Sequence, residues 1–404
     1  MAIVRPFRAH RPPVSLVARV SCPPYDVINT AEARVLARGD QDSLLRVTRP
    51  EIDFPEGTDE HDDRVYAQGR RNLDELIARG TLVPDAVPTY YVYAQRMGTH
   101  RQAGVVACVS VDDYERDVIK KHEKTRRDKE DDRTRHIDAL GAHDEPVFLT
   151  YRAVPAIDQA VARVMRTAPV YDFDGSDGVG HSLWLADPAE RDRLSILLAD
   201  VPILYVADGH HRSASAARVH RARRGQIGEH DVFMAVVFPD HQMLILPYNR
   251  VVRDRQGRSI SELLAVFRER FEVESAAEPA PREPQSFGLF LGDKWYRLRV
   301  RPGSFPVEDP VLGLDVSICQ EQILNGIFHI TDPCRDQNVD FVGGIRGAAE
   351  LERRVREQGW SAALFLHPTR VDQLMEVSEV GQLMPPKSTW FEPKLRSGLF
   401  LHLF

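Results

Sequence analysis

The sequence contains few cysteines, no long apolar run and no excess of positive charge. Its four cysteines, Cys22, Cys108, Cys319 and Cys334, form no C-x-x-C pair, so neither a zinc knuckle nor a disulfide framework is indicated. No apolar run approaches the roughly 20 residues of a membrane-spanning helix, and the first residues lack the apolar core of a signal peptide. These absences favour a cytoplasmic protein that has no membrane partner.

The charge balance is mildly acidic. The 404 residues include 53 Lys and Arg against 60 Asp and Glu, which gives a formal net charge of −7. Because only the cluster at 218–224 is locally basic, we do not expect a nucleic-acid partner. A hydrophobic content of 43% is ordinary for a globular protein, and the length allows two or three compact units.

The most informative stretch of the chain is a predicted strand, turn and helix at 202–224. The apolar run 203–206 is typical of a buried strand, and the small residues 213–217 favour the start of a helix. The turn between them consists of Asp208, Gly209, His210, His211 and Arg212. A strand that ends at a glycine and continues as a helix leaves backbone N–H groups that attract an anion. The stretch therefore predicts a phosphate cradle, and the alternative is a polar turn that only caps the helix.

Several short phrases resemble known families. The phrase ADGHHR, at 207–212, resembles a phosphate-binding phrase shared by the nucleotide domain of the ParB partition protein, sulfiredoxin and the archaeal free L-serine kinase. Nearly the whole chain resembles a bacterial family known as domain of unknown function 1015, on the phrases PPYDVI, IKKHEKT, DGHHR, FVGGIRG and MPPKSTWFEPKLRSGLF. The resemblance implies an α+β fold of mixed sheets with flanking helices, which contains a ParB/sulfiredoxin-like phosphate-binding core.

The clearest linker is a spacer rich in proline, alanine and glutamate at 274–285. It predicts a main α+β body at 1–273 and a C-terminal α+β subdomain at 286–404. We expect the subdomain to pack back on the core, because a plain tail has no need of Trp390 and Phe391.

The main body carries a highly charged insertion at 112–145. Such a run is typical of a solvated face or a mobile loop, and a mobile loop could close over a substrate as a lid. His136 and His143 lie in this insertion without the spacing of a metal site, so we expect both at the surface.

Two carboxylates are candidates for a general base. Asp26 follows a first strand expected between Ile3 and Pro24, where two prolines end the strand and fix the backbone. The alternative is that Asp26 only caps the next helix. Glu123, in the charged insertion, is the second candidate. In the serine kinase an acidic residue near the first strand activates the hydroxyl, and the resemblance places Asp26 in that role.

Cations for a polyphosphate occur in two further places. Lys121 and Lys124 flank Glu123, and Lys387 precedes two hydroxyl residues near the C-terminus. The C-terminal group, Lys387, Ser388 and Thr389, lacks the glycines of a P-loop, and packing around the neighbouring aromatic residues is its alternative role.

Together these groups favour phosphoryl transfer, which needs charge neutralisation, a base and in most cases a divalent metal. The resemblance implies that Asp208 holds Mg²⁺ and that Asp26 or Glu123 takes the proton of the acceptor, with His211 as a further catalytic group. The expected nucleotide-binding residues are Gly209, His210, His211, Arg212, Ser213, Lys121, Lys124, Lys387, Ser388 and Thr389. We expect a kinase that uses ATP or ADP and acts on a small hydroxyl metabolite, free L-serine being the first to test, in a chain that could form a homodimer.

Three alternatives stay open. A phosphatase that acts on a small phosphoester would use the same groups. A non-catalytic ParB-like nucleotide switch associated with DNA would require a basic helix-turn-helix, and none follows Arg224. Sulfiredoxin-like chemistry is disfavoured, because His210 stands where that enzyme's phrase carries its reactive cysteine.

Overall fold

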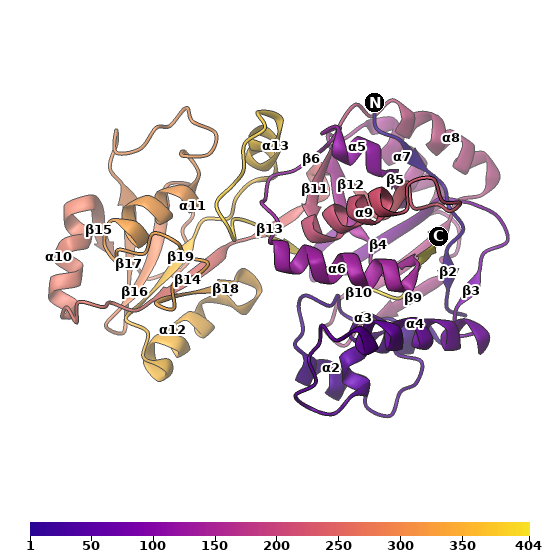
Figure 1. Ribbon diagram of the computed structural model, residues 1–404. Coiled ribbons are helices and arrows are strands. Elements are labelled where there is room, and N and C mark those ends of the chain that lie inside the picture. Colours follow the sequence, from indigo (N-terminus) through magenta and orange to yellow (C-terminus); the bar gives the residue numbers. More distant parts are fainter. The chain divides into compact units, whose positions relative to one another are not determined.

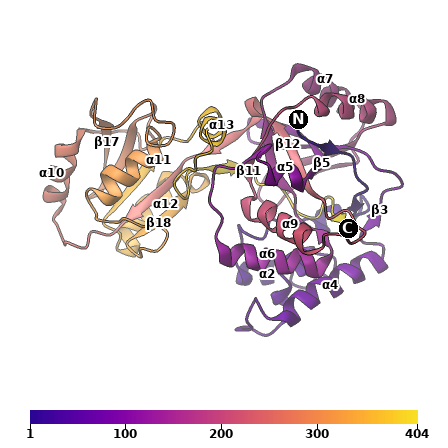
Figure 2. The ribbon, with the colours of Figure 1, turned by 45° about the horizontal axis from the view of Figure 1, so that its top comes forward.

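The computed structural model describes all 404 residues, and they form two compact units. Unit 1 comprises 1–121, 125–243 and 393–404, and unit 2 comprises 122–124 and 244–392. Each unit combines a sheet with flanking helices (Figures 1 and 2), so the expected α+β class with mixed sheets is confirmed. No helix has the length and apolar character that crossing a lipid bilayer would require.

Unit 1 is built around a nine-stranded sheet with the order β6-β11-β8-β12-β5-β4-β10-β9, in which β1 also pairs with β5. Its strands are β1 (Val4–Arg5), β4 (Tyr91–Met97), β5 (His100–Ser110), β6 (Ile119–Lys120), β8 (Val147–Tyr151), β9 (Tyr171–Asp174), β10 (Gly180–Leu185), β11 (Leu204–Asp208) and β12 (Val232–Pro239). Two short antiparallel pairs join β2 (His10–Arg11) to β3 (Val83–Pro84) and β7 (Ala142–His143) to β21 (His402–Leu403). The sheet is mixed, because β12 runs parallel to β8 and antiparallel to β5.

The central strands of unit 1 are apolar on both faces, and helices cover them. The helices of the unit are α1 (Val17–Val20), α2 (Thr30–Leu36), α3 (Leu45–Thr48), η1 (Pro50–Asp53), α4 (Asp63–Ala78), α5 (Val111–Glu115), α6 (Arg127–Leu140), α7 (Pro155–Val164), α8 (Pro188–Ala199), α9 (His210–Ala222) and η2 (Asp240–Gln242). Helix α9 packs against α6 and contacts β8 and β12 (Figures 1 and 2). The start of α9 is therefore fixed beside the end of β11.

Unit 2 contains a six-stranded antiparallel sheet with the order β15-β17-β16-β19-β14-β18. Its elements are β13 (Leu244–Leu246), β14 (Tyr248–Val252), α10 (Ile260–Arg270), β15 (Phe271–Ser275), β16 (Ser286–Leu291), β17 (Lys294–Val300), α11 (Asp315–Ile318), the π-helix η3 (Cys319–Asn325), β18 (Val339–Gly343), η4 (Gly344–Arg346), α12 (Gly347–Gln358), β19 (Ala362–Leu366), α13 (Val371–Glu379) and β20 (Trp390–Glu392). Helix α10 begins with a capping box of Ser259 and Glu262, and β16 and β17 form a hairpin.

The charged segment 112–145 is not a loop, contrary to the expectation. It contains α5, β6 and α6, and several of its polar side chains are buried in pairs. Asp132 accepts hydrogen bonds from Arg133 Nε at 2.8 Å and from the Tyr66 hydroxyl at 2.8 Å, while His136 Nε2 lies 2.9 Å from Asp144 Oδ2. Burial is tolerated because each charge has a partner. His136 is therefore buried instead of exposed.

His143 is a second correction, since its side chain is also buried and its Nε2 lies 3.2 Å from the Val232 carbonyl oxygen.

Several elements also differ from their expected extent. The expected first strand at 3–24 consists of β1, β2 and α1. The spacer 274–285 joins two strands of one sheet, and the chain instead passes from unit 1 to unit 2 between residues 243 and 244.

Gly104 offers a test of the packing of the unit 1 sheet. A Cβ atom at this position would lie 2.8 Å from Phe238 Cδ1, and that ring is fully buried. We expect Gly104→Ala to lower the free energy of unfolding by about 1–3 kcal/mol through overpacking, as measured by urea denaturation. The double variant Gly104→Ala/Phe238→Leu should lose less than the sum of the two single losses. Full additivity would contradict the close contact.

Candidate functional site

The turn between β11 and α9 requires a glycine. Gly209 has φ = +97°, and its N–H donates to Asp208 Oδ1 at 2.8 Å. A Cβ atom here would lie 3.2 Å from Arg212 Nε, so the guanidinium covers the turn closely. Helix α9 begins at His210, three residues before the expected start at Ser213. The residues expected to bind the anion therefore form the first turn of the helix.

The N-terminus of α9 has no side-chain cap. The first intrahelical bond runs from the Ser213 N–H to the Gly209 carbonyl oxygen at 3.0 Å, and the buried Ser213 hydroxyl donates to the same oxygen at 3.2 Å. The Ser213 hydroxyl thus uses its proton to bond the turn. The amides of His211 and Arg212 precede this bond and point where the helix dipole attracts an anion.

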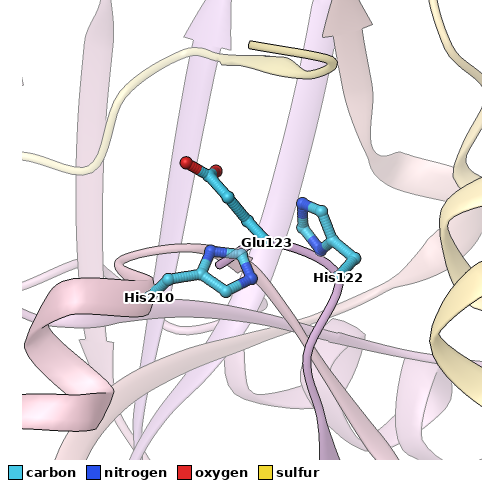
Figure 3. Close-up of side chains that lie close together, drawn as sticks. All are labelled: His122, Glu123 and His210. Atoms are coloured by element: carbon cyan, nitrogen blue, oxygen red, sulfur yellow. The ribbon is translucent and has the colours of Figure 1, made fainter. Parts of the chain in front are cut away.

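His211 and His210 have different surroundings. His211 Nε2 accepts a hydrogen bond from the Arg126 N–H at 3.1 Å, which leaves the proton of the neutral ring on Nδ1. Burial lowers the pKa of His211, although Asp26 and Glu130 act to raise it. His210 is buried at the first position of α9, where Figure 3 draws its ring.

Asp208, the last residue of β11, forms an ion pair with the C-terminal segment. Lys394 Nζ donates to Asp208 Oδ2 at 2.9 Å, and both side chains are about three-quarters buried. Burial alone would raise the pKa of Asp208, but Lys394 and Arg212 lower it well below its usual range. The carboxylate is therefore ionised, and it holds an ammonium group beside the turn.

Arg212 is a buried cation that lies between carboxylates. Its Nη1 donates to the Pro146 carbonyl oxygen, and its Nη2 lies 3.9 Å from Asp26 Oδ2. Burial acts to lower the pKa of Arg212, but Asp26, Glu145 and Asp208 together raise it above its usual range. The guanidinium keeps its charge and also lines a cavity of about 10 Å³, which has room for roughly one water molecule.

Asp26 is the more exposed carboxylate of the group, with 39% of its side chain accessible. Its neighbour Tyr25 is buried under Arg133, whose guanidinium carbon lies 4.2 Å from the ring centroid. The anchored Tyr25 fixes the backbone next to Asp26. This arrangement leaves the Asp26 carboxylate accessible to a ligand beside Arg212.

Glu145 connects the segments that carry these groups, although the sequence did not single it out. Its Oε1 accepts hydrogen bonds from the Tyr25 N–H at 2.9 Å and from the Ser397 hydroxyl at 3.0 Å. Burial raises the pKa of Glu145 to about 7, with Arg212 opposing this shift and Asp144 and Asp26 adding to it.

The other expected site residues divide between the two units, with Lys121 in unit 1 and the rest in unit 2. Lys121 pairs with Asp117 at 2.6 Å, and its Nζ lies 4.4 Å from the centroid of the Tyr114 ring. Both contacts link Lys121 to α5 and the residues that follow this helix. Glu123 and Lys124 belong to unit 2, as does His122, which Figure 3 labels with Glu123.

The C-terminal group predicted to bind phosphate also belongs to unit 2. There Lys387 Nζ lies 5.5 Å from the centroid of the Tyr248 ring, and the Ser388 hydroxyl donates to the Pro385 carbonyl oxygen at 2.6 Å. The roles expected for Glu123, Lys124, Lys387, Ser388 and Thr389 stay predictions.

Lys394 and Glu145 are the site residues that the sequence reasoning missed. Lys394 lies within the phrase EPKLRSGL, whereas Lys387 has the stronger local signal of a phosphate site because two hydroxyl residues follow it. Glu145 is the last acidic residue before the apolar strand β8. This position could have indicated a site residue, because a charge at the end of a buried strand is usually paired.

The fit of Asp208 as a magnesium ligand is poor in this arrangement. Its Oδ1 accepts the Gly209 N–H, and its Oδ2 accepts the Lys394 ammonium. A divalent cation on Asp208 would have to displace Lys394 and would lie near the charge of Arg212. The chemistry proposed below therefore uses no step through a metal held by Asp208.

The Asp208–Lys394 pair gives a test by pH. We expect Lys394→Met to lower the free energy of unfolding at pH 7 by roughly 1–3 kcal/mol, less than for a fully buried pair because both groups are partly exposed. The folded pKa of Asp208 lies below its unfolded value of about 3.9, so the pair stabilises the protein above that pH. This stability is lost as the pH falls through the folded pKa.

Urea unfolding at pH 7 and at pH 3 measures both effects. The wild type should lose more stability on acidification than Lys394→Met, and Asp208→Asn should show the same flattened pH dependence. Equal stability of the wild type and Lys394→Met at pH 7 would contradict the ion pair.

Comparisons with known proteins place this geometry in context. A family model described as "Protein of unknown function (DUF1015)" matches residues 4–317, which include Asp26, Glu145 and the β11–α9 turn but not Lys394. The phrases FVGGIRG and MPPKSTWFEPKLRSGLF lie beyond the matched range. No curated protein matches the chain.

Solved structures with detectable similarity are distant. A mutant of free serine kinase in complex with ADP is 14% identical, with a TM-score of 0.35 over 73% of this chain and 92% of that chain. A conserved hypothetical protein from Pyrococcus furiosus is 13% identical, with a TM-score of 0.37 over 74% and 95%. SbnI with a C-terminal truncation, from Staphylococcus aureus, is 14% identical, with a TM-score of 0.38 over 74% and 87%.

The family model covers more than half of the chain, and the expected family resemblance is confirmed. The chain belongs to the family described as Protein of unknown function (DUF1015).

Proposed function

We propose that unit 1 carries the catalytic site of a nucleotide-dependent phosphotransferase, a kinase that transfers a phosphoryl group to the hydroxyl of a small metabolite. Free L-serine is the first acceptor to test. One observation carries the proposal: Arg212 and Lys394 bring two cations to the uncapped N-terminus of α9, beside the accessible carboxylate of Asp26. Cations and helix amides neutralise phosphoryl oxygens, and a nearby carboxylate can accept the proton of a hydroxyl.

The reaction assigns a role to each group. Asp26 takes the proton of the acceptor hydroxyl, whose oxygen attacks the terminal phosphorus of the nucleotide. The bond between that phosphorus and the bridging oxygen breaks, and the shortened nucleotide leaves with the bonding electrons. Arg212, Lys394 and the first amides of α9 neutralise the charge on the phosphoryl oxygens. Asp26 then returns its proton to water.

Magnesium enters this proposal with the phosphates of the nucleotide, where it would neutralise charge, and not on Asp208. A phosphatase would use the same groups with water as the acceptor. The two activities differ in their products, because only the kinase forms a new phosphoester when an acceptor is added.

The test incubates the purified chain with ATP or ADP, with and without Mg²⁺, and with L-serine or other small hydroxyl compounds. Products are followed by phosphorus NMR. We expect acceptor-dependent phosphoester formation that Asp26→Asn slows by about 10²–10⁴-fold, the usual contribution of a general base. Arg212→Lys should raise the KM for the nucleotide, because a point charge replaces a planar fork.

Asp74→Asn provides the matched control, because Asp74 is exposed on α4 and pairs only with Arg70. It should retain the wild-type rate. Phosphate release without any new phosphoester would favour the phosphatase. Turnover that survives both Asp26→Asn and Arg212→Ala would contradict the assigned site.

A further inference from the structure

Glu145 lies where the three segments of the proposed phosphate site meet. Its Oε1 holds the amide of Tyr25, the residue before Asp26, at 2.9 Å. The same oxygen accepts the hydroxyl of Ser397, three residues after Lys394, at 3.0 Å. Glu145 also lines the small cavity of Arg212. One buried carboxylate therefore contacts the segments that position the base and both cations.

Burial opposes the ionisation of Glu145, and charges of both signs surround it. The charged and titratable groups around it are Arg212 from α9, Arg133 and His136 from α6, His143 and Asp144 just before it in the chain, and Cys22, Tyr25 and Asp26 from the N-terminal segment. Asp144 is itself held by His136 at 2.9 Å. Burial raises the pKa of Glu145 to about 7, and Arg212 opposes this shift. Glu145 is thus the carboxyl group here that changes its protonation near neutral pH.

We propose that Glu145 takes up one proton from solvent when the phosphates of a nucleotide bind at the N-terminus of α9. The inference rests on the proposed function and deepens it. Phosphates that pair with Arg212 bring new negative charge near a buried carboxylate, and like charges in a buried site favour the protonated form. The proton would go to Oε2, so that Oε1 keeps accepting from Tyr25 and Ser397.

The proposed role is one of positioning, because Glu145 touches no reacting atom in this scheme. A protonated Glu145 still holds the backbone before Asp26 and the segment after Lys394. It also stops competing for the charge of Arg212, which becomes available to the phosphate. Nucleotide binding then favours proton uptake, and proton uptake favours nucleotide binding by the same free energy.

Calorimetry with ADP measures this uptake directly. The enthalpy of binding is recorded at pH 8 in two buffers that differ in their enthalpy of ionisation, and the difference gives the number of protons bound. From a pKa of about 7, Glu145 is about nine-tenths ionised at pH 8 and about one-tenth ionised at pH 6. We expect an uptake of up to about 0.9 proton at pH 8 and at most about 0.1 at pH 6.

Glu145→Gln is the decisive variant, because the amide oxygen can still accept from Tyr25 and Ser397 but cannot titrate. At pH 8, Glu145→Gln should take up fewer protons than the wild type, by up to about 0.9 proton. Protons exchanged by ADP itself or by His136 are the same in both proteins and cancel in this difference. Ser397→Ala loses a hydrogen bond to the carboxylate and so raises the pKa of Glu145 further, and its uptake should be smaller than that of the wild type at pH 8 and recover at pH 9. This second variant keeps the test valid if Glu145→Gln folds poorly.

The outcomes separate the two claims. ADP binding with the same uptake in the wild type and Glu145→Gln, or with no uptake in the wild type, overturns the role of Glu145 and leaves the nucleotide site standing. An uptake by Ser397→Ala that equals the wild-type uptake at both pH 8 and pH 9 also overturns it. If neither ADP nor ATP produces binding heat with the wild type, the proposed function itself fails.

Discussion

The ion pair between Asp208 and Lys394 is the contact on which the arrangement of the site depends. It joins the last residue of β11 to a segment 186 positions later in the chain. Because Gly209 and the first turn of α9 follow Asp208 directly, the pair also places a second cation beside this turn. Without it, a buried carboxylate would face Arg212 alone, and the C-terminal segment would lose one of its polar anchors.

Local patterns were sufficient to predict the strand, turn and helix of the site. The apolar run before Asp208 has strand character, and Gly209 supplies the positive φ that the turn requires. The sequence named Asp26, Asp208 and Arg212 as candidates without relating Asp26 to the turn, and the fold brings Asp26 to 3.9 Å from Arg212. The start of α9 was placed too late, because polar residues in a first helical turn look like a loop.

Long-range partners could not be predicted from one sequence. Glu145 meets Ser397 across 252 positions, and no local period links the two. The charged segment 112–145 misled for the same reason, since its burial depends on partners such as Tyr66 for Asp132. The charges of a segment indicate the free energy required to bury it. The hydrogen bonds that offset this free energy come from residues distant in the sequence, and only the fold shows them.

A crystal structure of the protein with ADP would show whether the N-terminus of α9 binds phosphate. We expect density for the terminal phosphate there, within hydrogen-bond distance of the Arg212 guanidinium or the amides of His211 and Arg212. Lys394 should lie beside the phosphate and Asp26 on its open side. A nucleotide bound elsewhere, with Arg212 still paired only with protein groups, would contradict it.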